Sequence, residues 1–202
     1  MVSDASAPAP VAGLLLTGGT SRRMGSDKAL LEVDGQRLVD RAVSALTAVA
    51  DPVIEVGPGW SGLRAVREDP PGGGPLAAVA AGAAALREAG YGGPVLVLAV
   101  DMPRVGVDLL RLLAERPGPP TAVPRAAGHP QPLCARYGPE ALVAVDRLLA
   151  AGGRSLRGLL EAMDTRGGVG WVEEEEWGRV AEPAALSDVD TPDDLRRLLD
   201  GP

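Results

Sequence analysis

Short apolar runs alternate along the chain with longer segments whose apolar residues follow helical spacing. The run over residues 11–16 is continuously apolar, which is typical of a strand buried on both faces of a parallel sheet. Residues 94–100 give the strongest strand prediction, and this run leads directly into Asp101-Met102-Pro103. Shorter runs predict further strands at residues 53–56, 63–66, 121–123, 132–137 and 170–172.

The segments between these runs have the pattern of helices. Residues 38–50 place apolar side chains three or four positions apart, with polar residues between them. Residues 76–89 are strongly helix-prone, and Gly90 behind them is suited to end a helix. Thr191, with Asp194 three residues later, is a start signal for the last helix. The remaining helices are predicted at residues 107–115, 139–151, 155–163 and 192–199.

Strands that alternate with helices imply βαβ units. We therefore expect an α/β protein with a three-layer, Rossmann-like fold and a mostly parallel central sheet. The length of 202 residues and the hydrophobic content of 46% suit a single domain over residues 11–202, preceded by a disordered lead-in over residues 1–10. Ligands bind such sheets outside the carboxyl ends of the strands, so a site is expected in the loops after Leu16, Val66 and Val100.

Composition narrows the classes of function. The formal net charge of −7 argues against a general nucleic-acid binder, because phosphate backbones attract basic surfaces. Cys134 is the only cysteine, which excludes an intrachain disulfide and a cysteine-rich zinc site, and we predict that it fills the core. No apolar run approaches the ~18 residues that span a bilayer, and no signal peptide opens the chain. We expect a cytoplasmic protein whose partners include neither nucleic acid nor membrane.

The loop over residues 17–28 combines three glycines with three cations directly after a predicted strand. Glycines let backbone amides approach anionic oxygens, and Arg22, Arg23 and Lys28 can neutralise phosphate charge. Lys28 is the only lysine in a chain with 19 arginines, which reflects either chance or a need for a compact ammonium group. The loop is a candidate triphosphate cradle, and an ordinary glycine-rich turn with solvated arginines is the alternative.

Two familiar phosphate-binding motifs are excluded. The first loop lacks the glycine spacing and the Gly-Lys-Ser/Thr of a Walker P-loop. Residues 57–62 match G-x-G-x-x-G, but too few residues remain before Pro70 for a crossover helix, and Gly82 stands where a ribose-binding acid is needed. We interpret this segment as a flexible loop.

The first loop, from Leu16 to Lys28, resembles the L-A-G-G-x-x-x-R-M-G-x-D-K signature of the molybdenum cofactor guanylyltransferase family. Further segments extend the resemblance in the same order, over about residues 11–199. They are Glu68-Asp69 to Gly74-Pro75-Leu76-Ala77, Val100-Asp101-Met102-Pro103, His129-Pro130, Gly153-Arg154-Ser155-Leu156 and Asp190-Thr191-Pro192-Asp193-Asp194-Leu195. Related cytidylyl and sugar-phosphate nucleotidyltransferases more typically have Ala-Ala-Gly in this loop, so the pair Gly18-Gly19 favours the guanylyl branch.

This resemblance implies a magnesium-dependent nucleotidyltransferase that joins GMP from GTP to the terminal phosphate of molybdopterin, the pterin of the molybdenum cofactor, and releases pyrophosphate. Catalysis would depend on Arg23, Lys28 and Asp101. The implied nucleotide contacts are Leu16, Thr17, Gly18, Gly19, Lys28, Asp69 and Asp101. The resemblance also allows transient contacts with proteins that supply or accept the cofactor.

Asp101 is a candidate Mg²⁺ ligand on independent grounds. A carboxylate directly after a buried strand faces the ligand crevice, and Mg²⁺ prefers hard oxygen ligands. A helix N-cap is the alternative role. Asp188 and Asp190, where the family often has asparagine, are the candidates for a second ligand, although Asp190 also suits a turn before a helix.

The chain departs from the family pattern at two more positions, with Thr17 in place of the usual alanine and Gly57 in place of an asparagine. His129 lies in a His-Pro loop that approaches the pterin in the family. Arg154 and Arg157, near a predicted helix start, are candidates for the pterin phosphate, with a solvated helix face as the alternative.

The acidic run over residues 173–176 is interpreted as solvated. Two rival functions stay open. One is a related transferase that uses CTP or another phosphorylated acceptor, and the other is a GTP-binding module without catalysis.

Overall fold

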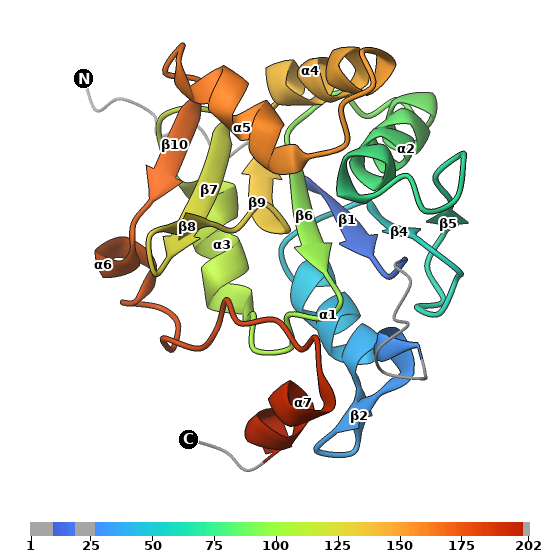
Figure 1. Cartoon of the computed structure of the whole chain (residues 1–202), viewed down its shortest axis with the longest axis vertical. Coiled ribbons are helices and arrows are strands. Elements are labelled where there is room, and N and C mark those ends of the chain that lie inside the picture. The colour runs from blue at the N-terminus through green and yellow to red at the C-terminus, as the bar shows by residue number, and fades with distance from the viewer. Residues whose placement is uncertain (1–9, 19–26, 200–202) are drawn as a thin grey trace, which may run out of the picture.

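The computed structural model describes residues 10–18 and 27–199, and it places a central sheet between two layers of helices (Figure 1). In spatial order the strands are β10 (Val169–Val172), β7 (Thr121–Ala126), β9 (Cys134–Tyr137), β6 (Val95–Ala99), β1 (Ala12–Leu16), β4 (Val53–Val56) and β5 (Ala65–Val66). β9 pairs antiparallel with β6 and β7, whereas the other neighbours in this order pair parallel. The prediction of a mostly parallel α/β sheet is therefore confirmed.

Helices cover both faces of this sheet. The helices of the described residues are α1 (Leu38–Thr47), α2 (Pro75–Glu88), α3 (Val107–Glu115), α4 (Pro139–Ala150), α5 (Leu156–Asp164), α6 (Glu174–Trp177) and α7 (Pro192–Leu199), with a short 3-10 helix η1 at Lys28–Leu30. Helix α7 lies away from the central sheet (Figure 1). Alternate side chains of β1 enter different cores: Leu15 packs with α1 and α3, while Leu14 and Leu16 pack with α2, α4 and α5. Within the described residues, no helix is long and apolar enough to cross a membrane.

Helix α2 lies unusually close to the sheet. A Cβ added to Gly82 would lie 2.6 Å from a methyl carbon of Leu14 and 2.8 Å from one of Val56. Glycine at this position and the many alanines of α2 let the helix approach strands β1 and β4. Gly82, where a dinucleotide-binding protein would need an acid, therefore has a packing role.

Each predicted strand and helix is present with bounds shifted by a few residues, and five short elements of the described residues were not predicted. These are η1, the hairpin of β2 (Glu32–Val33) and β3 (Gln36–Arg37), the strand β8 (His129–Pro130) that pairs with β7, and α6. Strands of two residues are too short to show a period of two. The turn Asp34-Gly35, with φ of 54° and 75°, was nevertheless a readable hairpin signal.

The acidic run over residues 173–176 is exposed at Glu173, Glu174 and Glu175, as interpreted, but it also makes specific ion pairs. It contributes to α6, and Glu176 binds the guanidinium of Arg116 through two hydrogen bonds of 2.7 and 3.1 Å. Glu173 pairs with Arg125 at 3.1 Å, and the guanidinium of Arg125 lies 3.9 Å from the ring centre of Trp171. Two of the four glutamates thus hold α6 against β7, β10 and the end of α3. Cys134 is fully buried, as predicted.

Candidate active site

The carboxyl ends of β1, β4 and β6 meet at one edge of the sheet and line a cavity of about 280 Å³. Residues that are far apart in sequence form its wall. They are Leu16, Thr17, Gly18, Asp27, Lys28, Val56, Glu68, Gly72, Gly74, Pro75, Ala78, Ala99, Val100, Asp101 and Leu133. The cavity lies where ligands bind in parallel α/β sheets, and its volume is just below the ~300 Å³ at which typical small-molecule pockets begin.

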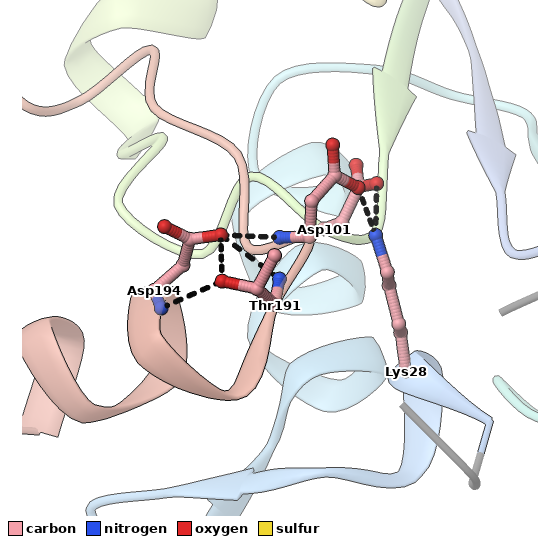
Figure 2. A network of polar contacts seen from close by, with 5 residues as sticks. Lys28, Asp101, Thr191 and Asp194 are labelled. Carbon is pink, nitrogen blue, oxygen red and sulfur yellow. Dashed lines mark hydrogen bonds and ion pairs between the residues drawn. The ribbon is translucent and has the colours of Figure 1, made fainter. Parts of the chain in front are cut away.

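Lys28 and Asp101 are brought together in this cavity from positions 73 residues apart (Figure 2). The ammonium nitrogen of Lys28 lies 3.3 Å from Oδ2 of Asp101 and also donates a hydrogen bond to Oδ1 of Asp190. The side chains of Lys28 and Asp101 are only 16% and 24% exposed. A cation from η1 is therefore held between carboxylates that follow strand β6 and precede helix α7.

The surroundings of Lys28 and Asp101 shift the pKa of each group, for different physical reasons. Burial by itself lowers the pKa of Lys28, but the hydrogen bond that Lys28 donates to Asp190 and the charge of Asp101 outweigh it, so the pKa lies above its ordinary value. Burial raises the pKa of Asp101, and the charges of Asp190 and Asp188 add to this, while Lys28 opposes it. At neutral pH Lys28 therefore stays an ammonium ion.

A hydrogen bond joins the segment before helix α7 to Asp101, just after β6. The amide of Val189 donates to the carbonyl oxygen of Asp101 at 2.8 Å. Figure 2 shows the next step, a reciprocal cap in which the Thr191 hydroxyl and amide donate to Asp194 Oδ2, and the Asp194 amide donates to Thr191 Oγ1. The predicted helix start is thus confirmed, and it positions Asp190 beside Lys28.

The carboxylates at this edge suit Mg²⁺ by their chemistry. Asp101 and Asp190 both contact Lys28, and Asp188 lies near enough to raise the pKa of Asp101. In the part of the chain that is described, no group of three or more His, Cys, Asp or Glu side chains is arranged to hold a metal ion. One or two carboxylates suffice for Mg²⁺, which usually keeps several waters and binds substrate phosphates.

The acidic pair Glu68-Asp69 faces the cavity through its first member. Glu68 lines the wall, and its Oε1 accepts a hydrogen bond of 3.2 Å from the amide of Gly72. Asp69, the residue that the family resemblance selected, is exposed and does not line the cavity. Sequence reasoning therefore missed Glu68, whose signal was its place directly beside the chosen residue.

A second missed residue is Glu55, in the middle of β4. Its carboxylate is fully buried and accepts hydrogen bonds from Thr17 and from the loop over residues 57–62. That loop has no crossover helix, as predicted, but its amides are bound to Glu55, which corrects the interpretation of a freely flexible loop. A single charge within an apolar strand was the signal in the sequence.

The remaining predicted residues are spread around the cavity. Gly19 and Arg23 lie outside the described residues, as does Arg22. Arg154 is exposed at the start of α5, and its carbonyl oxygen would lie 3.7 Å from a Cβ on Gly74, so its backbone borders the cavity wall. Arg157 and His129 are exposed on α5 and β8 and are not part of the wall.

Comparison with known proteins shows which family this chain resembles. The family model for MobA-like NTP transferase domains matches residues 13–167. A probable molybdenum cofactor guanylyltransferase from Chloroflexus aggregans is 35% identical over 202 residues, which cover 92% of this chain and 92% of that protein.

Solved structures show the same fold. The molybdopterin-guanine dinucleotide biosynthesis protein A of Archaeoglobus fulgidus has a TM-score of 0.76 at 24% identity and covers 94% of this chain and 97% of its own. The 2-C-methyl-D-erythritol 4-phosphate cytidylyltransferase of Thermus thermophilus has a TM-score of 0.63 at 24% identity, with coverage of 95% and 98%.

Proposed function

The chain belongs to the family of MobA-like NTP transferases and is a nucleotidyltransferase, and we propose that it transfers GMP from GTP to the terminal phosphate of molybdopterin. The observation that carries this proposal is the shared cavity of Lys28 and Asp101, in which a cation suited to phosphate oxygens lies beside a candidate metal ligand. Relatives named probable molybdenum cofactor guanylyltransferases, similar over most of both lengths, support these two substrates.

Lys28 is proposed to bind phosphate oxygens of the nucleotide. Its ammonium ion is already oriented by Asp101 and Asp190, so little conformational freedom is lost when a phosphate arrives. Phosphate oxygens and the Asp190 carboxylate compete for the same ammonium ion, and we expect the nucleotide to displace Asp190. Arg23 is proposed as a second cation on the phosphates.

In the reaction, an oxygen of the pterin phosphate attacks the α-phosphorus of GTP. A new P–O bond forms while the bond between the α-phosphorus and the bridging oxygen breaks, and the electron pair leaves with pyrophosphate. The attacking phosphate is already ionised at neutral pH, so no general base is required. Positioning and neutralisation of charge then supply the catalysis.

Asp101, with Asp190 or Asp188 as the second candidate ligand, is proposed to hold Mg²⁺, which would neutralise phosphate charge when bound. Asp101 suits this role because it follows β6 directly and the amide of Val189 binds its carbonyl oxygen. Once a phosphate displaces Asp190 from Lys28, that carboxylate becomes available to a cation.

The cavity wall suggests where each substrate binds. Leu16, Thr17 and Gly18 are proposed to contact the nucleotide together with Gly19, and Glu68 joins Asp69 as a candidate acid on that side. Arg154 is the best supported residue for the pterin phosphate, since its backbone borders Gly74. Arg157 and His129 are proposed for the pterin from the sequence. A cytoplasmic location is part of the same proposal.

The test measures nucleotide choice and then turnover. Thermal stabilisation of the protein is compared for GTP, CTP, ATP and UTP with magnesium, and we expect the largest rise in melting temperature with GTP. Pyrophosphate release is then followed with GTP and molybdopterin. A preference for CTP would favour the cytidylyl alternative, and GTP binding without pyrophosphate release would favour a non-catalytic module.

A further inference from the structure

Glu55 is a buried acid that the proposed chemistry does not use. It pairs with Leu15 of β1 and Ala65 of β5, and its neighbours Ile54 and Val56 belong to the core beneath α2. The side chain of Glu55 therefore points to the opposite face of the sheet, where the core is otherwise apolar. A carboxylate that is 0% exposed in this place needs hydrogen-bond partners.

The partners of Glu55 come from two segments of the chain. Its Oε1 accepts from the hydroxyl of Thr17 at 2.5 Å and from the amides of Gly59 and Trp60 at 2.7 and 3.0 Å. Its Oε2 accepts from the amide and the hydroxyl of Ser61 at 2.7 and 2.5 Å. Burial raises the pKa of this carboxyl group, but the hydrogen bonds outweigh it, so the pKa lies below its ordinary value.

Only one of these two segments belongs to the cavity. Thr17 and Gly18 line it, whereas residues 59–61 lie behind Thr17 and are not part of the wall. The close fit depends on Gly57, where an added Cβ would lie 2.0 Å from Thr17 Oγ1 and 2.8 Å from the Gly18 amide nitrogen. Gly57 and Thr17, two of the departures from the family pattern, are therefore in contact beside Glu55.

We propose that Glu55 is a positioning residue, which holds Thr17 and the Gly18 backbone where the nucleotide contacts them. This inference rests on the proposed function, because it assumes that the nucleotide binds along Thr17 and Gly18. An ionised carboxylate suits the role, since five donors converge on its two oxygens. A glutamine would turn an NH₂ group toward those donors.

The first test is Glu55→Gln, with Glu88→Gln as the matched control for loss of one negative charge. Glu88 is 75% exposed and lies 4.0 Å from Arg64. We expect Glu55→Gln to raise the KM for GTP about tenfold while kcat changes less than about twofold, because a looser wall weakens binding rather than chemistry. Glu88→Gln should match the wild type. A purely structural Glu55 would lower the melting temperature and leave the KM of the folded protein unchanged, which would overturn the proposal.

Ser61→Ala keeps the proposal testable if Glu55→Gln does not fold. Ser61 lies outside the cavity wall, and its hydroxyl reaches Thr17 only through the carboxylate of Glu55. We expect Ser61→Ala to raise the KM for GTP about threefold. Thr17→Val and the double variant Ser61→Ala/Thr17→Val are measured as well. The rise in KM of the double variant should be smaller than the product of the rises in the two single variants, because both substitutions act on one carboxylate. A wild-type KM in Ser61→Ala, or two effects that multiply, would overturn the proposal.

The wild-type protein separates failure of this inference from failure of the proposed function. If it binds CTP rather than GTP, the proposed nucleotide is wrong, and the same variants are compared by their KM for CTP. If it binds no nucleoside triphosphate, both proposals fail. If it turns over GTP and the variants keep its KM, the positioning role alone is wrong.

Discussion

Each half of the sheet buries a charged side chain, Glu55 on one side and Arg136 on the other, and in the described part of the chain neither is paired with an opposite charge. On the β4 side, Glu55 accepts five hydrogen bonds from amides and hydroxyls. On the β9 side, Arg136 is 6% exposed and donates four hydrogen bonds of 2.7 to 3.0 Å to carbonyl oxygens. Local dipoles thus stabilise both charges.

The two buried charges differ in the segments of the chain that they bind. The carbonyls bound by Arg136 belong to Ala114, Arg116, Pro119 and Pro120, at the end of α3 and in the turn before β7. Since β7 is antiparallel to β9 and β9 to β6, this turn lies at the sheet edge opposite to the cavity. Glu55 instead binds Thr17 in the cavity wall. A buried charge therefore indicates a constrained segment, and the position of that segment decides whether function depends on it.

The largest expected effect is on turnover, in variants of the cavity itself. Lys28→Ala and Asp101→Ala should each lower kcat/KM by about 10²- to 10³-fold, because a preorganised charge at the reacting phosphates is lost. The exposed residues Arg196 and Asp108 supply the controls Arg196→Ala and Asp108→Ala. Steady-state kinetics and circular dichroism measure activity and folding. Activity near that of the wild type in either cavity variant would count heavily against the proposed function.

The next effect is on stability, at the opposite edge of the sheet. Arg136→Met leaves four part-buried carbonyl oxygens without the donor that Arg136 supplies, and we expect it to lower the free energy of unfolding by about 3 kcal/mol. The KM for GTP should stay within about twofold of the wild type, because Arg136 lies away from the cavity. Urea unfolding and kinetics measure the two quantities. A clear rise in KM would remove the contrast with Glu55.

Gly82→Ala is expected to have an intermediate effect on stability, because the added methyl group crowds the core beneath the site and contacts no charged group. The added methyl group would meet Leu14 and Val56 at 2.6 to 2.8 Å, which should cost about 2 kcal/mol of stability. Gly92→Ala is the matched control, since nothing lies within 4 Å of its Cβ position. Thermal unfolding of both variants checks the difference. Equal melting temperatures would show that α2 has more room than the structure indicates.

A smaller effect is expected from the cap that places Asp190. Thr191→Ala removes a hydroxyl that both donates to and accepts from Asp194, and we expect a loss of about 1 kcal/mol in stability. We also expect kcat/KM to fall about twofold, because Asp190, a candidate Mg²⁺ ligand, is then positioned less firmly in the site. Thr165→Ala, which removes an exposed hydroxyl bonded to Ala162 at the end of α5, is the control. Unchanged kinetics in Thr191→Ala would separate the cap from the site.

Much of the fold was predictable because it depends on local pattern. Continuous apolar runs such as residues 95–99 show a buried parallel strand directly, and helical spacing shows α1 and α3. The hairpin β2–β3 and the strand β8 were missed because two-residue strands are determined by turn geometry and by their neighbours. Helix α6 was missed because ion pairs with Arg116 and Arg125, which are distant in sequence, hold its glutamates.

The site was predictable where one residue carries its own signal. Lys28 and Asp101 stand in distinctive motifs, in the loop after β1 and just after β6, and the structure brings them into one cavity. Glu55 was missed because its role depends on Thr17 and Ser61, whose side chains meet only after β1 and β4 have paired. Glu68 lines the cavity wall and Asp69 does not, and this difference depends on the direction of the backbone after β5, which the sequence does not show.

The smallest expected effect is a dependence on pH, and it distinguishes the two buried charges most directly. The pKa of Glu55 in the folded protein lies below its ordinary value near 4.5, so its stabilising effect is complete above that value and is lost as the pH falls through the folded pKa. The difference in unfolding free energy between the wild type and Glu55→Gln should therefore stay constant above about pH 5.5 and narrow as the pH falls below about 4.5. Arg136 stays charged throughout this range, so the difference between the wild type and Arg136→Met should stay constant. Urea unfolding at several pH values measures both differences. The contributions of the other carboxyl groups to the pH dependence are common to wild type and variant, so they largely cancel in each difference. A gap for Glu55→Gln that stays constant or widens on acidification would show that this carboxylate is not stabilised as an anion.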